Sequence, residues 1–132
     1  MTERRRYRRK PDQFVVAIQL RLKMDALIYS KWGSEQRCKP GDWIVDNNGD
    51  IYTVDADVFE RTYREVHEVH RGVYQKITPV WAEPARTSGQ VASNSGLTQY
   101  HQGDYLVFNN EVGSDAYAMT AGKFESSYEL DE

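Results

Sequence analysis

The sequence predicts a mainly β protein made of two tandem copies of one small module. Three observations carry this prediction: a motif that recurs at a nearly constant offset, short stretches of alternating apolar and polar residues, and turn residues at intervals of about 8 to 12 residues. No stretch has the periodicity of a long helix. We therefore expect a tandem duplication of an SH3-like or half-barrel β module with one helical turn per copy. A module of about 60 residues buries only about 60% of its unfolded surface, so the copies should pack as a pseudo-symmetric unit.

The repeat is clearest where Gly41-Asp42 matches Gly103-Asp104, at an offset of 62 residues. An aromatic residue and two aliphatic residues follow in both places. Past the next turn the second copy holds three extra residues, a length change typical of a hairpin, and the offset becomes 65. The pairs at that offset are Asp50/Asp115, Tyr52/Tyr117, Phe59/Phe124, Glu60/Glu125 and Tyr63/Tyr128. The predicted organisation is a basic arm at 1–10, modules at 7–66 and 74–132, and a linker at 67–73.

The first strand is predicted over 16–23, where apolar and polar residues alternate. Its buried face is expected to carry Val16, Ile18, Leu20 and Leu22, and its exposed face Ala17, Gln19, Arg21 and Lys23. Residues 26–30 and 43–45 favour further short strands. The second copy repeats this order, and its small polar segment 87–96 is expected to be a flexible loop or a poorly packed edge strand.

A tight hairpin is predicted at residues 47–50, because Asn and Gly tolerate the positive φ angles of a two-residue turn. Residues 55–60 then favour one helical turn, with Asp57 and Glu60 spaced as a capping box. A last strand is expected over 63–69.

The stretch from 39 to 66 resembles the PGDYG-type small domain of bacterial and phage proteins. The residues that carry the resemblance are Pro40, Gly41, Asp42, Trp43, Ile44, Val45, Tyr52, Asp57, Phe59, Glu60 and Tyr63. The second copy resembles it more weakly, since Gln102 replaces the proline. The resemblance implies module boundaries and no particular activity.

Both repeated motifs are interpreted as structural. A Gly-Asp dipeptide before a strand is typical of a turn whose carboxylate accepts backbone N–H bonds, although a carboxylate there could also bind a ligand amine or a metal. The Phe-Glu-x-x-Tyr motif is expected to supply core rings and a capping or pairing glutamate. The structural residues are Gly41, Asp42, Phe59, Glu60, Tyr63, Gly103, Asp104, Phe124, Glu125 and Tyr128.

The aromatic residues exceed what two very small cores need. We expect some of them either to line a groove for a ligand or partner or to fill the interface between the copies. The candidates for ligand binding are Trp43, Tyr52, Trp81, Tyr105 and Tyr117.

The arm is the strongest feature of the charge pattern. The chain has a net charge of -3, and six cations lie within seven residues, so the remainder carries -9. These cations are Arg4, Arg5, Arg6, Arg8, Arg9 and Lys10. They are predicted to contact nucleic-acid phosphates, to form a solvated tail, or to lie on the acidic body, and the acidic body favours the last two.

Several function classes are excluded or disfavoured. Cys38 is the single cysteine, and with the three histidines it makes no set of ligands at zinc spacing, so neither a metal nor a cofactor is expected. Nucleophile-elbow and phosphate-loop motifs are absent from the sequence. No apolar run approaches the roughly 20 residues of a membrane span, so a cytoplasmic protein is expected.

The leading hypothesis is a non-enzymatic module that binds a protein, a peptide or a small ligand in an aromatic groove or in the cleft between the copies. Two alternatives stay open: an accessory nucleic-acid binder that uses the arm, and an enzyme that acts on a nucleotide or sugar in the cleft. Pairing of edge strands between two chains, which would give a homodimer, stays open as well.

Overall fold

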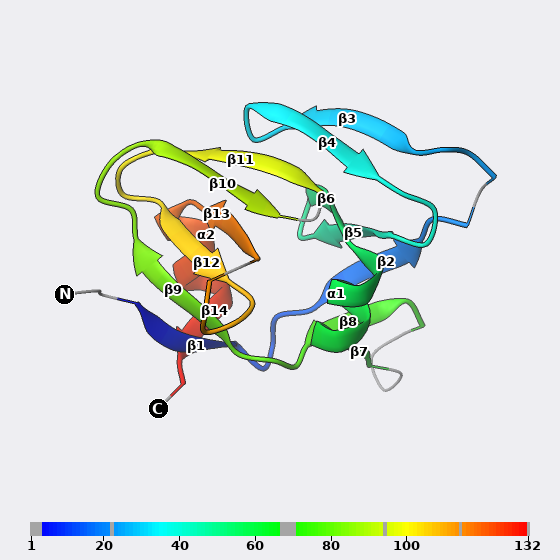
Figure 1. The fold of residues 1–132 in the computed structure, drawn as a ribbon. Helices are drawn as coiled ribbons and strands as arrows, with labels where there is room; N and C mark the ends of the chain where they lie inside the picture. The colour runs from blue at the N-terminus through cyan, green and yellow to red at the C-terminus, as the bar shows by residue number, and fades with distance from the viewer. Residues whose placement is uncertain (1–3, 22, 67–70, 94, 114, 132) are drawn as a thin grey trace.

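The computed structural model describes residues 4–21, 23–66, 71–93, 95–113 and 115–131. These residues form fourteen strands and two short helices, arranged in three antiparallel sheets (Figure 1). The prediction of a mainly β fold is confirmed. None of the three sheets closes on itself in the described residues, so the expectation of a small barrel is wrong. Each sheet instead covers its inner face with a helix or with another sheet, which removes the need for closure.

Two of the sheets have five strands each and the same strand order. We call the first, with helix α1 (Ala56–Thr62), the first lobe, and the second, with helix α2 (Ala121–Ser127), the second lobe. The first lobe runs β6 (Asp50–Val54), β5 (Trp43–Asn47), β2 (Val15–Gln19), β8 (Val73–Lys76) and β7 (Tyr63–Glu65). The second lobe runs β13 (Ala116–Met119), β12 (Tyr105–Phe108), β9 (Val80–Pro84), β1 (Arg5–Arg9) and β14 (Tyr128–Leu130).

Strands β1 and β8 each lie in the sheet built mainly from the other predicted module, and we call them the exchanged strands. Strand β1 lies between β9 and β14 of the second lobe, where Tyr7 pairs with Val80 on one side and Leu130 on the other. Strand β8 lies between β2 and β7 of the first lobe. Each sheet therefore draws strands from both predicted modules, and the N-terminal arm is an interior strand of a sheet.

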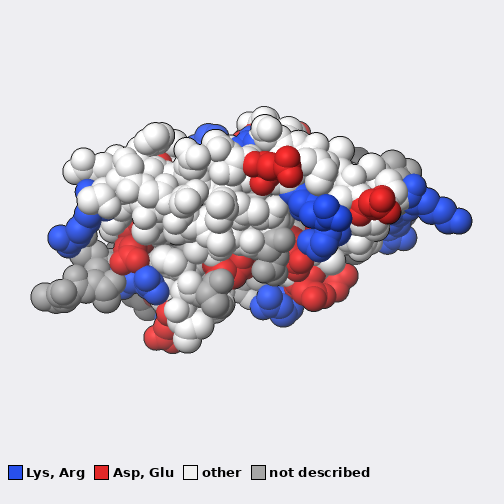
Figure 2. All heavy atoms as spheres, turned by 45° about the horizontal axis from the view of Figure 1, so that its top comes forward, with Lys and Arg blue, Asp and Glu red and all other residues white. Residues whose placement is uncertain are grey.

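The third sheet joins two hairpins and lies across the two lobes (Figure 1). Its order is β10 (Gly89–Ser93), β11 (Gly96–Tyr100), β4 (Ser34–Cys38) and β3 (Leu27–Lys31). The polar segment that begins at residue 87 thus supplies an edge strand, as one of its two interpretations predicted. We call this sheet the roof. Uncharged side chains cover most of its outer surface (Figure 2).

The cores of the two lobes repeat one aromatic arrangement. In the first lobe, Phe59 stacks between Trp43 and Tyr63, with ring centroids 4.2 and 4.5 Å away. Tyr74, from the exchanged strand, meets Phe59 edge-on at 5.1 Å. Such ring pairs add to the stabilisation from buried area.

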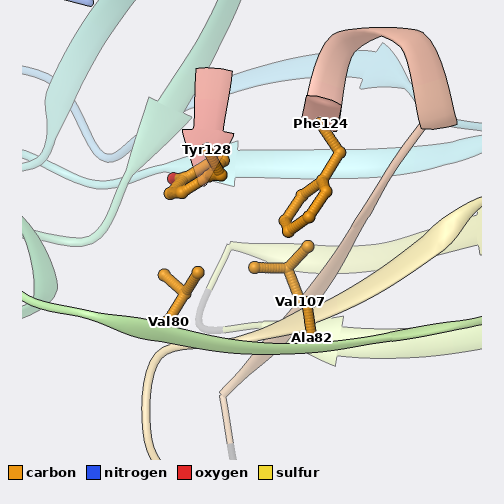
Figure 3. Close-up of a cluster of buried hydrophobic side chains, with 5 residues drawn as sticks. All are labelled: Val80, Ala82, Val107, Phe124 and Tyr128. Atoms are coloured by element: carbon orange, nitrogen blue, oxygen red, sulfur yellow. The ribbon is translucent and has the colours of Figure 1, made fainter. Parts of the chain in front are cut away.

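In the second lobe, Phe124 stacks between Tyr105 and Tyr128, at 4.3 and 5.1 Å. The exchanged strand again adds an edge-on ring, Tyr7, at 4.8 Å. Phe124 from α2 and Tyr128 from β14 pack against Val80, Ala82 and Val107 of the sheet (Figure 3). The Phe-Glu-x-x-Tyr motif thus places its phenylalanine on the helix and its tyrosine on the first residue of the strand that follows, with both rings in the core.

Strand β2 confirms the alternation predicted for the first strand but reverses its faces. Val16 and Ile18 are 56% and 66% exposed, whereas Val15 and Ala17 are 2% and 8% exposed. The inner layer is filled by the aromatic stack, so the sheet beneath it accepts compact side chains such as Ala17. Leu20 is buried as expected, and residue 22 lies outside the described residues.

The hairpin at Asn48-Gly49 is confirmed, with φ angles of 54° and 93° in the loop between β5 and β6. Helix α1 is longer than the single turn predicted, and its cap is Asp55 rather than Asp57. The Asp55 carboxylate accepts hydrogen bonds from the backbone N–H groups of Asp57 and Val58. Of the predicted last strand and linker, residues 67–70 lie outside the described residues. No helix in the described part of the chain is long and apolar enough to cross a bilayer.

Candidate ligand cavity between the lobes

A cavity of about 300 Å³ lies where the two lobes and the roof meet. Strands β6 and β13 contribute to its walls, and each is one of the two edge strands of its lobe sheet. The hairpins of the roof contribute Trp32, Ser93 and Thr98. The volume lies at the lower end of the range of about 300 to 1,000 Å³ that is usual for small-molecule sites.

The two lobes line the cavity with matched residues. Each lobe contributes an asparagine at or next to the end of a strand, a carboxylate, two tyrosines and a long cation. The matched pairs are Asn47/Asn109, Asp50/Asp115, Tyr52/Tyr117, Tyr63/Tyr128 and Arg9/Lys76.

Arg9 and Lys76 are the cations of the cavity, and each is only 7% exposed. The Arg9 guanidinium donates to Asn47 Oδ1 at 2.9 Å. The Lys76 ammonium donates to Asn109 Oδ1 at 2.7 Å and to the Tyr117 hydroxyl at 3.2 Å. Within the described residues neither cation forms an ion pair with a carboxylate. Burial lowers the pKa of Lys76, because the interior solvates the ammonium poorly.

Four tyrosines surround these cations. Burial raises the pKa of Tyr52 to about 12 and holds those of Tyr63 and Tyr117 well above 10.0. For Tyr128 burial acts in the same direction, but Lys76 and Arg9 outweigh it, and the pKa of Tyr128 is lowered. The hydroxyls of Tyr117 and Tyr128 lie 3.4 Å apart. The cavity therefore presents phenol hydroxyls and positive charge in one small volume.

The carboxylates that line the cavity have partners of their own. Asp50 forms ion pairs with Lys31 at 3.0 Å and Lys123 at 3.3 Å. Asp115 accepts a hydrogen bond from Asn109 Nδ2 at 2.8 Å. The other two carboxylates are engaged as well: Asp55 caps α1 and pairs with Lys39, and Asp104 accepts from the backbone of His101.

Trp32 lies at the tip of the roof hairpin formed by β3 and β4. Its φ angle is 56°, in the left-handed region that a tryptophan rarely adopts, so the hairpin holds it there at a cost. The Trp32 ring lies 6.0 Å from that of Tyr52. An aromatic side chain therefore closes part of the cavity from the roof side.

The predicted ligand-binding aromatics divide into two groups. Tyr52 and Tyr117 line the cavity. Trp43 and Tyr105 instead stack on the core phenylalanines, and Trp81, on strand β9, is not among the cavity residues. The structure thus brings two of the five candidates together.

Part of this site is not evident from the sequence. The sequence pattern gives Lys76 no role, places Arg9 in the arm, and favours Tyr63 and Tyr128 as core residues alone. A signal was present: Arg9 and Lys76 each stand two residues after a tyrosine, Tyr7 and Tyr74. A cation at the same spacing after a tyrosine in both segments indicates a shared environment, here the cavity.

The Gly-Asp motifs have the structural role predicted for them. Asp42 is 1% exposed and accepts hydrogen bonds at 2.9 Å from Lys39 N, Lys39 Nζ and the backbone N–H of Ala56. Asp104 accepts one, from His101 N at 2.9 Å. Gly41 and Gly103 both have a φ of 95°, which favours glycine in these turns. Glu60 and Glu125 are exposed on their helices.

The basic arm lies on the acidic body, one of the three interpretations offered for it. Strand β1 is hydrogen-bonded on both sides, and its outward side chains meet acidic partners of the second lobe. The ion pairs are Arg4–Glu83 and Arg8–Glu129 at 2.8 Å and Arg6–Asp131 at 3.1 Å. Lys10 donates to the backbone carbonyl of Glu125 at 2.8 Å, and Arg5 is exposed.

The histidines, cysteine and carboxylates do not assemble into a metal site in the part of the chain that the structure describes. Cys38 is fully buried, and burial raises the pKa of its thiol. Comparison with known proteins gives no relative: no family model, curated protein or solved structure matches this chain.

Proposed function

We propose that this protein is a non-enzymatic binding module that takes a small ligand into the cavity between its lobes. The observation that carries the proposal is the set of matched side chains with which both lobes line one cavity. Burial of a cation costs free energy unless an opposite charge is paired with it. A ligand that pairs with such a group recovers part of that cost.

The same proposal includes the origin of the site. We infer that the chain is a tandem duplication whose two copies have exchanged one strand, so that one cavity forms between them. The matching strand orders and aromatic stacks support it. The proposed ligand site depends on this cavity and not on the resemblance to the PGDYG-type domain.

The test is a thermal-shift screen of the whole protein against carboxylates, phosphates, nucleotides, sugars and neutral aromatic compounds. A ligand held at 100 times its dissociation constant adds about 2.7 kcal/mol to the free energy of unfolding. We expect at least one compound to raise the melting temperature of the wild type by several degrees.

Two adjacent substitutions locate the site. Thr98 is 3% exposed and lines the cavity, so Thr98→Phe fills it, whereas Leu97 is 41% exposed on the other face of β11. We expect Thr98→Phe to abolish the shift and Leu97→Phe to retain it. Far-UV circular dichroism checks the fold, and Ser93→Phe is a second filling variant. A screen without hits, or a hit that survives both filling variants, would refute the proposal.

A further inference from the structure

We propose that the ligand of the cavity is a small molecule that carries a carboxylate or phosphate group on a compact apolar body. This inference rests on the proposed function and names the ligand class. Its basis is that the cavity holds two buried cations, Arg9 and Lys76, which contact amide and phenol oxygens but no carboxylate in the described residues.

The two cations form a place for one anion. They come from the exchanged strands β1 and β8 at corresponding positions, since Arg9 pairs with Tyr128 and Lys76 with Tyr63. Both line the same cavity. An uncompensated buried cation raises the energy of the empty protein, and the field of two such cations favours a negatively charged group between them. Arginine binds carboxylate or phosphate with two parallel hydrogen bonds, and lysine adds a third as a point charge.

The protein's own carboxylates do not fill that place. Asp50 is held by Lys31 and Lys123, and Asp115 is held by Asn109. Asp115 acts on Lys76 only through space, with Asn109 between them. The two cations can therefore pair with an anionic group of a ligand.

The other residues that line the cavity indicate the polarity and the size of the rest of the ligand. The hydroxyls of Tyr117 and Tyr128 lie beside the cations, where they donate to a second oxygen of the anion. The side chains of Tyr52, Tyr117 and Trp32 line the cavity and favour an apolar, ring-sized body. A cavity of about 300 Å³ leaves no room for a large ligand.

Isothermal titration calorimetry of the whole protein with benzoate, phenyl phosphate and benzamide tests the inference. The first two probes distinguish a carboxylate from a phosphate ligand, and benzamide is the neutral counterpart of benzoate. Binding is measured in the wild type and in Arg9→Gln and Lys76→Met. Arg8→Gln is the matched control, because Arg8 is the neighbour of Arg9 on the outer face of β1 and pairs with Glu129.

We expect benzoate or phenyl phosphate to bind at least tenfold more tightly than benzamide. Arg9→Gln and Lys76→Met should each weaken that binding by about ten- to a hundredfold, the loss typical of a charge-assisted hydrogen bond, and Arg8→Gln should leave it within about twofold. Both cavity variants should melt at or above the wild-type temperature, because they remove an uncompensated buried charge. A melting temperature well below that of the wild type would make both cations structural and would refute the inference.

Two other results would overturn it and differ in what they mean for the proposed function. If benzamide binds as tightly as the anions and ignores both variants, or if only neutral compounds shift the melting temperature, the ligand class is wrong while the cavity remains a binding site. If no compound of either experiment binds, both proposals fail.

Discussion

The two Gly-Asp motifs supply a matched test of how side chains stabilise this fold. Asp42 and Asp104 occupy the same position in the repeat, yet Asp42 is buried and accepts three hydrogen bonds, whereas Asp104 is half-buried and accepts one. One of the three bonds comes from the first residue of α1, so Asp42 also fixes the start of that helix. Removing Asp42 should therefore cost much more than removing Asp104.

The magnitude follows from the bonds lost. Asp42→Ala leaves the backbone N–H groups of Lys39 and Ala56 without their acceptor at a buried site, and each such group costs about 1 to 3 kcal/mol. The expected loss is about 3 kcal/mol, or roughly 10 to 15 °C in melting temperature for a chain of this size. Asp104→Ala exposes one N–H group to water and should cost about 1 kcal/mol.

The assay is equilibrium unfolding in guanidinium chloride, followed by tryptophan fluorescence and far-UV circular dichroism. Coincident transitions by the two probes establish that one free energy of unfolding describes the change. Losses that are equal for the two variants, or larger for Asp104→Ala, would refute the structural role assigned to Asp42.

Three further predictions follow from the fold. Ile18→Thr on the exposed face of β2 should change the free energy of unfolding by less than about 0.5 kcal/mol, whereas Val45→Ala, at 0% exposure, should cost about 2 kcal/mol; similar losses would contradict the observed faces. A fragment of residues 1–70 lacks β8 and should be unfolded or dimeric by light scattering, because only a second copy can supply the missing strand, and a folded monomer would refute the exchange. Stability should fall above pH 10 in urea unfolding, since buried Tyr52, Tyr63 and Tyr117 stay protonated in the folded state while the unfolded chain loses those protons. The lowered pKa values of Tyr128 and Lys76 act in the opposite direction but are outnumbered, so a free energy that rises from pH 10 to 12 would contradict the burial of these phenols.

Local features of the fold were predictable from the sequence where a short motif favours one particular conformation. Asn48-Gly49 gives the hairpin its positive φ angles, and the Asp42 carboxylate stabilises its turn by accepting a hydrogen bond from the backbone N–H of Lys39. The Phe-Glu-x-x-Tyr spacing placed Phe59 and Tyr63 in the core. In each case the interactions lie within a few residues of the motif.

The strand exchange was not predictable in this way. The repeat shows which strands correspond, but a strand such as β1 has the same pattern whether it pairs within its own copy or with the other. The buried face of β2 was predicted wrongly because Val16 and Ile18 are more apolar than Ala17. The aromatic layer above the sheet leaves room only for small side chains such as Ala17.

The cavity escaped prediction for a related reason. Charged residues are usually exposed, so Arg9 and Lys76 were not expected in a buried site. Their burial follows from the places of β1 and β8, which are interior strands with a neighbour on each side. Only the three-dimensional arrangement brings them together with Tyr63 and Tyr128.

The most direct measurement is a crystal structure of the protein grown with 4-iodobenzoate, in which anomalous scattering locates the iodine. We predict an iodine peak inside the cavity, with the carboxylate oxygens within hydrogen-bond distance of Arg9 and Lys76. A protein saturated with the compound whose cavity stays empty, or a peak only on the outer surface, would contradict a ligand site between the lobes.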